Sequence, residues 1–121
     1  METQKSQSSR ASEDSNMLNA EEIAKLTRAV FRKYKVQKAI LFGSFARGRQ
    51  TRKSDVDLIL IRDSKDPYFK RFEGILPDLY EKIPGRDIEV FIYTPEELAR
   101  IGHRSFIKRA LEQGKVIYES G

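Results

Sequence analysis

Cysteine is absent from the 121-residue sequence, and histidine occurs only once. A chain without thiols can form neither a disulfide framework nor a thiolate metal site, and it suits a reducing compartment. The single histidine, His103, lies beside Gly102 at an expected helix start. This position favours a structural or solvated role over a catalytic one.

Long hydrophobic runs are also absent. The apolar segments extend for only a few residues, whereas a membrane-spanning helix needs about 20, and the N-terminal residues are polar. The sequence therefore predicts neither an export signal nor a membrane span, and a cytoplasmic location is expected.

The sequence does contain enough apolar material for one compact core. Hydrophobic residues make up 39% of the chain, which suffices for one domain but not for two. Residues 1–18 lack apolar periodicity and are rich in Ser, Gln and charge, so we expect a disordered tail there and a folded domain over 19–121. The whole chain carries a net charge of +5, and the domain carries +6, because the tail has two basic and three acidic side chains. A basic domain favours a phosphate-bearing ligand or an acidic partner.

Hydrophobic periodicity predicts an alternating α/β order. Asn19 is the expected N-cap of the first helix. Gly74 and Pro77 should bend or split the helix expected over residues 69–83. Phe69 lies on the apolar stripe of that helix and is expected in the core unless the bend exposes it. The expected fold is a small α/β domain with a mixed sheet of three to four strands flanked by helices. Helices are expected over residues 20–35, 69–83, 95–101 and 104–113, a short turn or helix opens at Ser44, and strands cover 36–42, 55–62, 86–93 and, as an edge strand, 115–119.

The stretch LFGSFARG, residues 41–48, runs a predicted strand directly into a glycine and a helix start. Such a junction offers backbone N–H groups at a helix N-terminus, and Gly43 lets the backbone approach a ligand closely. The Ser44 hydroxyl can cap the helix or bond a phosphate oxygen, and Arg47 adds positive charge. The stretch is a candidate phosphate site. Taken alone, it also fits a tight turn with a helix cap, and Arg47 fits a surface ion pair.

Two carboxylates, Asp55 and Asp57, precede the apolar run of the second predicted strand. The period of two places both on one face, roughly 6.5–7 Å apart at the backbone. Two such acids repel each other and have raised pKa values unless a cation lies between them, and Mg²⁺ binds carboxylate oxygens in this way. In isolation the acids also fit solvated residues at a strand start. Beside a phosphate site, however, they indicate phosphoryl or nucleotidyl transfer.

The spaced motif Gly43-Ser44, ten residues, then Asp55-Val56-Asp57 resembles the signature of the DNA polymerase beta superfamily of nucleotidyltransferases. Over residues 20–119 the chain is similar to the minimal nucleotidyltransferases that are paired with HEPN-domain toxins in prokaryotic toxin–antitoxin modules. The resemblance implies that Gly43 and Ser44, with Arg47 beside them, hold the phosphates of ATP. It also implies that Asp55, Asp57 and a third carboxylate bind Mg²⁺, with two ions expected.

The third carboxylate departs from the aspartate that is usual in the family. The apolar pattern of DIEVFIY aligns Glu89 with that position, and Asp87, two residues earlier on the same face, is the competitor. Glutamate can bind Mg²⁺ but is one methylene longer, and active-site geometry is sensitive to about 1 Å. We expect Glu89 to be catalytic and metal-binding. The alternative is an exposed position on a half-buried strand.

By this resemblance, the expected function is Mg²⁺-dependent transfer of AMP from ATP to a hydroxyl, with a tyrosine of a HEPN toxin as the acceptor. The chain would be the antitoxin of a type VII-like module. About a hundred folded residues leave little room for an acceptor-binding domain, so a second protein or a second copy should complete the site.

Two alternatives belong to other functional classes. A binding-only antitoxin would mask its partner without turnover, and the glutamate at the third position keeps this alternative open. A small-molecule nucleotidyltransferase is disfavoured because no extra helical domain follows the core. Direct nucleic-acid binding is disfavoured because basic residues alternate with acidic ones and no base-stacking platform is visible.

Overall fold

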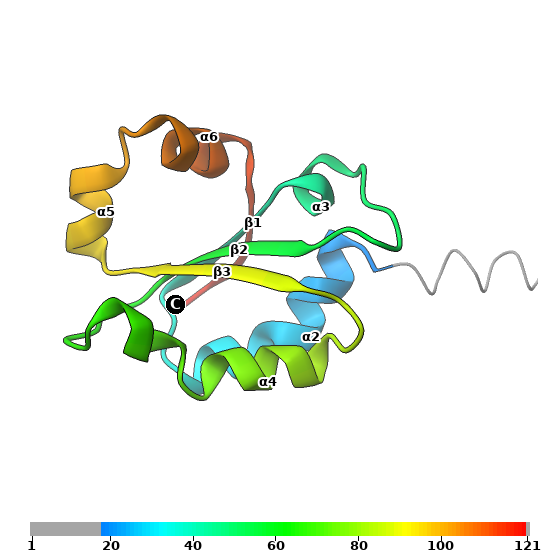
Figure 1. Cartoon of the computed structure of the whole chain (residues 1–121), viewed down its shortest axis with the longest axis horizontal. Helices are drawn as coiled ribbons and strands as arrows, with labels where there is room; N and C mark the ends of the chain where they lie inside the picture. The colour runs from blue at the N-terminus through cyan, green and yellow to red at the C-terminus, as the bar shows by residue number, and fades with distance from the viewer. Residues whose placement is uncertain (1–17, 121) are drawn as a thin grey trace, which may run out of the picture.

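A computed structural model describes residues 18–120 and places a four-stranded sheet between two groups of helices (Figure 1). The predicted α/β fold with a mixed sheet is confirmed. No helix within these residues combines the length and the apolar character that crossing a membrane requires. In chain order the elements are α2 (Ala20–Lys33), β1 (Lys38–Phe42), α3 (Ser44–Arg47), β2 (Val56–Ile61), the 3₁₀ helix η1 (Tyr68–Phe72), α4 (Ile75–Lys82), β3 (Ile88–Tyr93), α5 (Pro95–Ile101), α6 (Ser105–Gln113) and β4 (Lys115–Glu119).

The predicted tail, residues 1–18, lies outside the described residues except for its last residue. Leu18 packs against the core, and its carbonyl accepts a hydrogen bond from Gln50 Nε2 at 3.2 Å. The prediction was wrong at this residue. Leu18 directly precedes the N-cap Asn19, and an apolar side chain at that position commonly packs against the first turns of the helix; the core cluster that Leu18 contacts includes Ile23 of α2.

The strands lie in the order β3-β2-β1-β4, with β1 antiparallel to both neighbours and β2 parallel to β3. Because of these directions, the C-terminal end of β1 meets the N-terminal ends of β2 and β3 at one end of the sheet. Phe42 lies opposite Asp57, and Asp57 lies opposite Glu89. Three segments that are far apart in the sequence therefore converge there.

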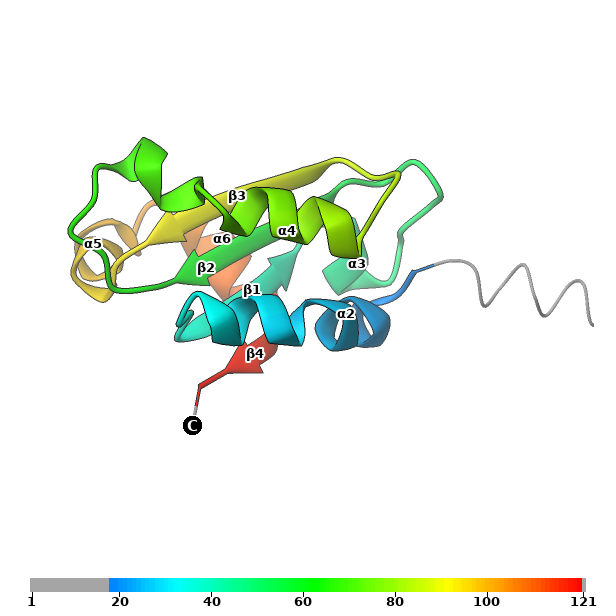
Figure 2. The ribbon, with the colours of Figure 1, turned by 90° about the horizontal axis from the view of Figure 1, so that it is seen from below.

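Side chains alternate between the two faces of the sheet. The larger core lies on the face covered by α2 and α4, as Figure 2 shows. A smaller cluster on the other face joins Ile40 and Ile59 to Ala110 of α6. Since Asp57 precedes Ile59 by two residues on β2, its side chain belongs to the face that carries α6.

The predicted helix over residues 69–83 is split at Gly74, which has a φ of 79° and is the N-cap of α4. Pro77 lies in the first turn of α4 and does not break the helix, because N–H groups there have no intrahelical partner. The split places Phe69 on η1 with 71% of its surface exposed. The prediction of a core position was therefore wrong for Phe69, and its stated alternative holds with Gly74 as the cause.

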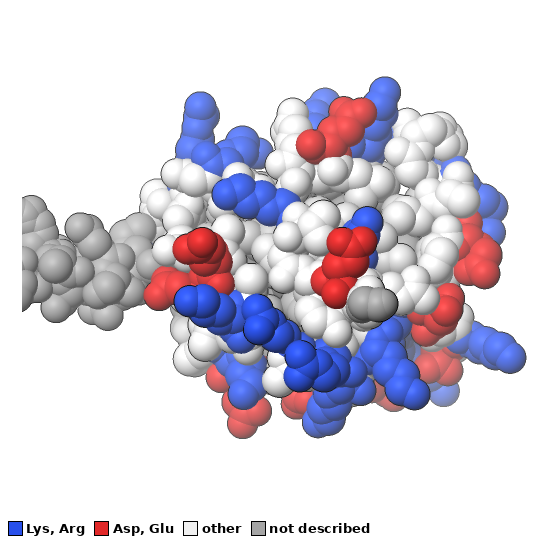
Figure 3. Space-filling view, turned by 180° about the vertical axis from the view of Figure 1, so that it is seen from behind, with Lys and Arg blue, Asp and Glu red and all other residues white. Residues whose placement is uncertain are grey.

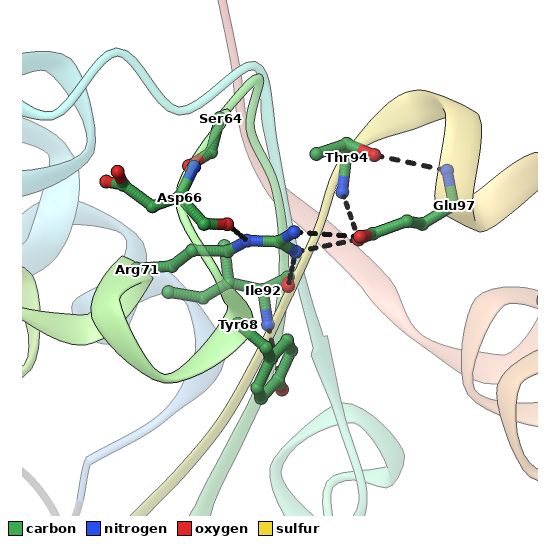
Figure 4. Close-up of polar contacts among 7 residues, drawn as sticks. All are labelled: Ser64, Asp66, Tyr68, Arg71, Ile92, Thr94 and Glu97. Atoms are coloured by element: carbon green, nitrogen blue, oxygen red, sulfur yellow. Dashed lines mark hydrogen bonds and ion pairs between the residues drawn. The ribbon is translucent and has the colours of Figure 1, made fainter.

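Arg71 is a charged side chain in the interior, with only 6% of its surface exposed. Its guanidinium donates to both carboxylate oxygens of Glu97, at 2.7 and 2.8 Å, and to the backbone carbonyls of Ile92 and Asp66, at 3.0 and 3.2 Å (Figure 4). A buried ion pair is stable only when its geometry is good and its remaining donors are satisfied, and both conditions hold here. The pair fastens η1 to the junction of β3 and α5.

This ion pair predicts a specific loss of stability in acid. The Arg71 guanidinium, with help from the Thr94 amide, lowers the pKa of Glu97 from 4.5 to about 2. A depressed carboxyl pKa contributes stability that is complete above about 4.5 and is lost as the pH falls towards 2. We expect the melting temperature of the parent to fall across this window more steeply than that of Glu97→Gln. Thermal denaturation at a series of pH values measures this difference.

The control for this prediction is Glu96→Gln. Glu96 is the exposed neighbour of Glu97, and within residues 18–120 its side chain makes no ion pair. Its variant should keep the steep acid dependence of the parent. Equal slopes for the parent and Glu97→Gln would contradict the prediction.

Candidate active site

Gly43 forms the junction between β1 and α3 with a backbone conformation that suits glycine alone. Its φ is 74° and its ψ is −149°, a region essentially closed to residues with a Cβ atom. Its carbonyl accepts hydrogen bonds from the amides of Ala46 and Arg47, at 3.1 and 3.2 Å. A Cβ atom at this position would collide with Oδ2 of Asp57. The glycine therefore lets the backbone of the junction lie directly against that carboxylate.

Ser44 is the first residue of α3, and Gly43 rather than Ser44 is the N-cap. The sequence left open whether the hydroxyl caps the helix or bonds a ligand. The capping alternative is wrong. Gly43 occupies the N-cap position, so Ser44 is already the first residue of the helix and its hydroxyl does not cap it. Within residues 18–120 the Ser44 hydroxyl makes no hydrogen bond.

Asp57 is the half-buried centre of a carboxylate cluster at this end of the sheet. Its pKa is raised from 3.8 to about 6, first by burial, then by the charge and the hydrogen bond of Glu89, and then by the charge of Asp55. Arg47 acts in the opposite direction on this pKa. The structure thus brings Asp55, Asp57, Glu89 and Arg47 into electrostatic contact beside Gly43.

The competing carboxylate, Asp87, lies just before β3 and is exposed. Its backbone carbonyl accepts a hydrogen bond from the amide of Val56 at 2.9 Å, which starts the parallel ladder. The register then places Glu89, not Asp87, opposite Asp57. Glu89 is itself exposed, so its carboxylate is accessible to a molecule that approaches this end of the sheet.

The donor set at this site fits Mg²⁺. Burial and the repulsion from two further carboxylates raise the pKa of Asp57, and a divalent cation would offset both effects. Within residues 18–120, no three acidic, histidine or cysteine side chains are arranged closely enough to enclose an ion by themselves. Mg²⁺ is commonly bound through one or two carboxylates together with substrate phosphates, so an open arrangement of this kind is suitable.

A cavity of about 200 Å³ adjoins the site on the side of α6. It shares Gly43 and Arg47 with the junction and is completed by Phe106, Arg109 and Gln113 of α6. The Phe106 ring is 49% exposed and contacts the Phe42 ring edge-on, with the ring centroids 5.7 Å apart. Sequence analysis missed these α6 residues. The available signal was an aromatic residue and an arginine three residues apart on one amphipathic helix.

The comparisons with known proteins agree with this geometry. The family model described as polymerase beta nucleotidyltransferase matches residues 24–121. The chain belongs to this family. The predicted family resemblance and enzyme class are therefore confirmed, and the protein is a nucleotidyltransferase.

Relatives of this nucleotidyltransferase include two proteins of Methanocaldococcus jannaschii that are both named "Putative protein adenylyltransferase". MJ1379 is 35% identical over 82 residues, which cover 67% of this chain and 75% of the relative. MJ0604 is 32% identical over 101 residues, which cover 79% of this chain and 94% of the relative.

A crystal structure described as a toxin–antitoxin with AMP-PNP has a similar fold. It superimposes on the nucleotidyltransferase with a TM-score of 0.59 and 25% identity, covering 85% of this chain and 75% of the other.

Proposed function

We propose that this nucleotidyltransferase transfers AMP from ATP to a tyrosine hydroxyl of a HEPN-type toxin and acts as its antitoxin in the cytoplasm. The observation that carries the proposal is the register that places Asp57 opposite Glu89, with Asp55 and the Gly43 junction beside them. The protein partner is supported by relatives named as protein adenylyltransferases and by the similar toxin–antitoxin structure.

Each group at the site has a role in this reaction. Gly43 and Ser44 hold the phosphates of ATP, and Arg47 adds positive charge beside them. Asp55, Asp57 and Glu89 would hold Mg²⁺, with two ions expected, and the bound metal would neutralise phosphate charge and lower the pKa of the acceptor hydroxyl. The acceptor oxygen bonds to the α-phosphorus, the bond to the β-phosphate oxygen breaks, and pyrophosphate leaves. In this proposal Glu89, whose side chain is exposed, takes the hydroxyl proton.

The test is transfer of label to a partner. The nucleotidyltransferase is mixed with a HEPN protein, Mg²⁺ and ATP labelled in the α-phosphate, and labelled tyrosine is sought by mass spectrometry. We expect labelling by the parent and by Glu89→Asp, and a decrease of ~10²–10⁴-fold with Glu89→Gln, because general base catalysis contributes about that factor. Binding of the HEPN protein without any transfer by the parent would instead support a binding-only antitoxin.

The α6 cavity predicts where the base of the nucleotide lies. Its volume of about 200 Å³ is below the ~300–1,000 Å³ of pockets that enclose whole drug-sized ligands, so it can hold a base while the phosphates remain at Gly43. Stacking on an aromatic ring is worth about 1–3 kcal/mol. Phe106→Ala should therefore weaken ATP binding by ~5–150-fold, whereas Phe106→Tyr should not. Calorimetric titration with ATP measures this effect.

Inorganic tripolyphosphate provides the control for the Phe106 prediction. It carries the phosphates of ATP without the base, so Phe106→Ala should leave its affinity unchanged. Equal losses for ATP and tripolyphosphate would show that the substitution damages the phosphate site instead of a base site.

A further inference from the structure

The two edges of the sheet differ in how their backbone groups are satisfied. At the β3 edge, the Tyr80 hydroxyl accepts a hydrogen bond from the amide of Ile88 at 3.1 Å, and the Tyr68 hydroxyl accepts one from the amide of Ile92 at 3.3 Å. Arg71 donates to the carbonyl of Ile92 at 3.0 Å (Figure 4). Side chains of η1 and α4 thus occupy backbone groups that a further strand would need.

The β4 edge has no such cover. β4 is the last strand in the sheet order, and within residues 18–120 no side chain forms a hydrogen bond to its backbone. Val116 on this strand is 53% exposed, and Ile117 and Tyr118 are half-buried. An uncovered edge strand with apolar side chains is a template for pairing with another extended segment.

A band of basic side chains lies beside this open edge. Lys25, Arg28 and Arg32 follow one another at helical spacing on the exposed surface of α2, and Lys35 comes just after the helix. Within residues 18–120 none of the four forms an ion pair. Figure 3 shows basic side chains gathered into such a band across this face of the molecule.

The band and the edge strand form one surface. Arg28 and Arg32 line a hollow of about 450 Å³ together with residues 117–120 at the end of β4. An extended segment paired with β4 would therefore place side chains of one face against the two guanidinium groups. Unpaired guanidinium groups favour carboxylates, which they can bind through two parallel hydrogen bonds.

We propose that β4 and the basic band of α2 bind an acidic, extended segment of a partner protein, which adds to the sheet as a fifth strand. A second copy of this chain fits poorly, because antiparallel pairing of two β4 strands would bring two basic bands together on the same face. A nucleic acid also fits poorly. The Tyr118 ring packs on Phe31 with centroids 5.6 Å apart, so this ring is not available for stacking on bases.

This inference goes beyond the transfer reaction and does not depend on it. The carboxylate cluster lies on β2 and β3, whereas β4 is the opposite edge of the sheet. Peptide binding is therefore measured without ATP, and Asp57→Asn should bind the peptide as the parent does. Loss of transfer and loss of peptide binding are thus separate results.

The probe is a fluorescein-labelled peptide of about ten residues in which Glu and Val alternate, and fluorescence anisotropy at low salt measures its affinity. We expect the parent to bind this peptide and not to bind a peptide of the same length in which Lys and Val alternate. Arg28→Glu combined with Arg32→Glu should weaken binding at least tenfold, and Arg28→Gln should weaken it less. The matched control is Lys65→Glu combined with Lys70→Glu, at two exposed lysines in the loop after β2 and in η1. This pair changes the net charge by the same amount and should leave the affinity for the peptide within about twofold of the parent.

Amide hydrogen exchange then tests whether the peptide pairs with β4. We expect the amides of residues 115–119 to exchange at least fivefold more slowly when the peptide is bound. Binding without this protection would overturn strand addition. Tighter binding of a thymidine decanucleotide than of the acidic peptide would overturn the choice of partner, and so would protection of β4 by self-association without peptide.

Discussion

Replacing Gly43 with alanine is expected to remove nearly all transfer activity. The φ of 74° and ψ of −149° cost a residue with a Cβ atom about 1–3 kcal/mol, and the added methyl group would collide with Oδ2 of Asp57. The carboxylate must then move, and a displacement of about 1 Å in an active site can reduce the rate ~10²-fold. Turnover and melting temperature should both fall, and a transfer assay with thermal denaturation measures the two effects.

Gly48→Ala is the matched control for Gly43→Ala. Gly48 ends the same short helix with a φ of 70°, but a Cβ atom there would meet nothing within 4 Å. Its variant should lose about 1–2 kcal/mol of stability from the left-handed backbone and keep its turnover. Similar turnover in the two variants would show that contact between position 43 and Asp57 has no importance for catalysis.

Asp57→Asn should remove transfer and, at the same time, make the metal-free protein more stable. The Asp57 carboxylate is half-buried and lies near the charges of Glu89 and Asp55, so its ionised form is unfavourable in the absence of a cation. Removing this charge should raise the melting temperature at neutral pH in EDTA by about 4–8 °C, which corresponds to roughly 1 kcal/mol. Transfer should fall ~10³-fold or more, because the amide lacks the charge that the proposed Mg²⁺ site requires.

Two further measurements make the Asp57 prediction specific. Mg²⁺ should raise the melting temperature of the parent, because an ion that binds only the folded state stabilises it, and it should not raise that of Asp57→Asn. The control is Asp87→Asn, a carboxylate at the same end of the sheet but outside the cluster, which should match the parent in both respects. Lost transfer in Asp87→Asn together with full transfer in Glu89→Gln would move the role of third carboxylate to Asp87.

Local patterns in the sequence were sufficient to predict most of the helices and strands, whereas the grouping of Glu89 with Asp55 and Asp57 was implied only by the family resemblance. The helix predicted over residues 95–101 is α5, which starts at a capping box of Thr94 and Glu97, and residues 115–119 form the predicted edge strand β4. These features depend on neighbours within a few residues. The break at Gly74 was also visible locally, although Pro77 was an equally plausible cause before the backbone geometry was known.

Features that depend on distant contacts were not predictable in this way. Arg71 and Glu97 are 26 residues apart, and each has the appearance of a surface charge until the fold brings them together. The α6 cavity likewise exists only because Phe106 is placed over Phe42, which belongs to a strand far earlier in the chain. Sequence periodicity assigns residues to a face, but it does not say which other element will cover that face.

The pairing of β1 with β4 has a consequence for the order of folding. Lys38 lies opposite Glu119, so the first strand of the sheet acquires its second neighbour only when the last element is present. During synthesis, β1, β2 and β3 can assemble with α2 and α4 while one side of β1 is still unpaired. Contacts between such distant segments form slowly, and an unpaired apolar strand is prone to aggregation. A released chain that ends before residue 115 would therefore keep the carboxylate cluster on a sheet in which one side of β1 is unpaired.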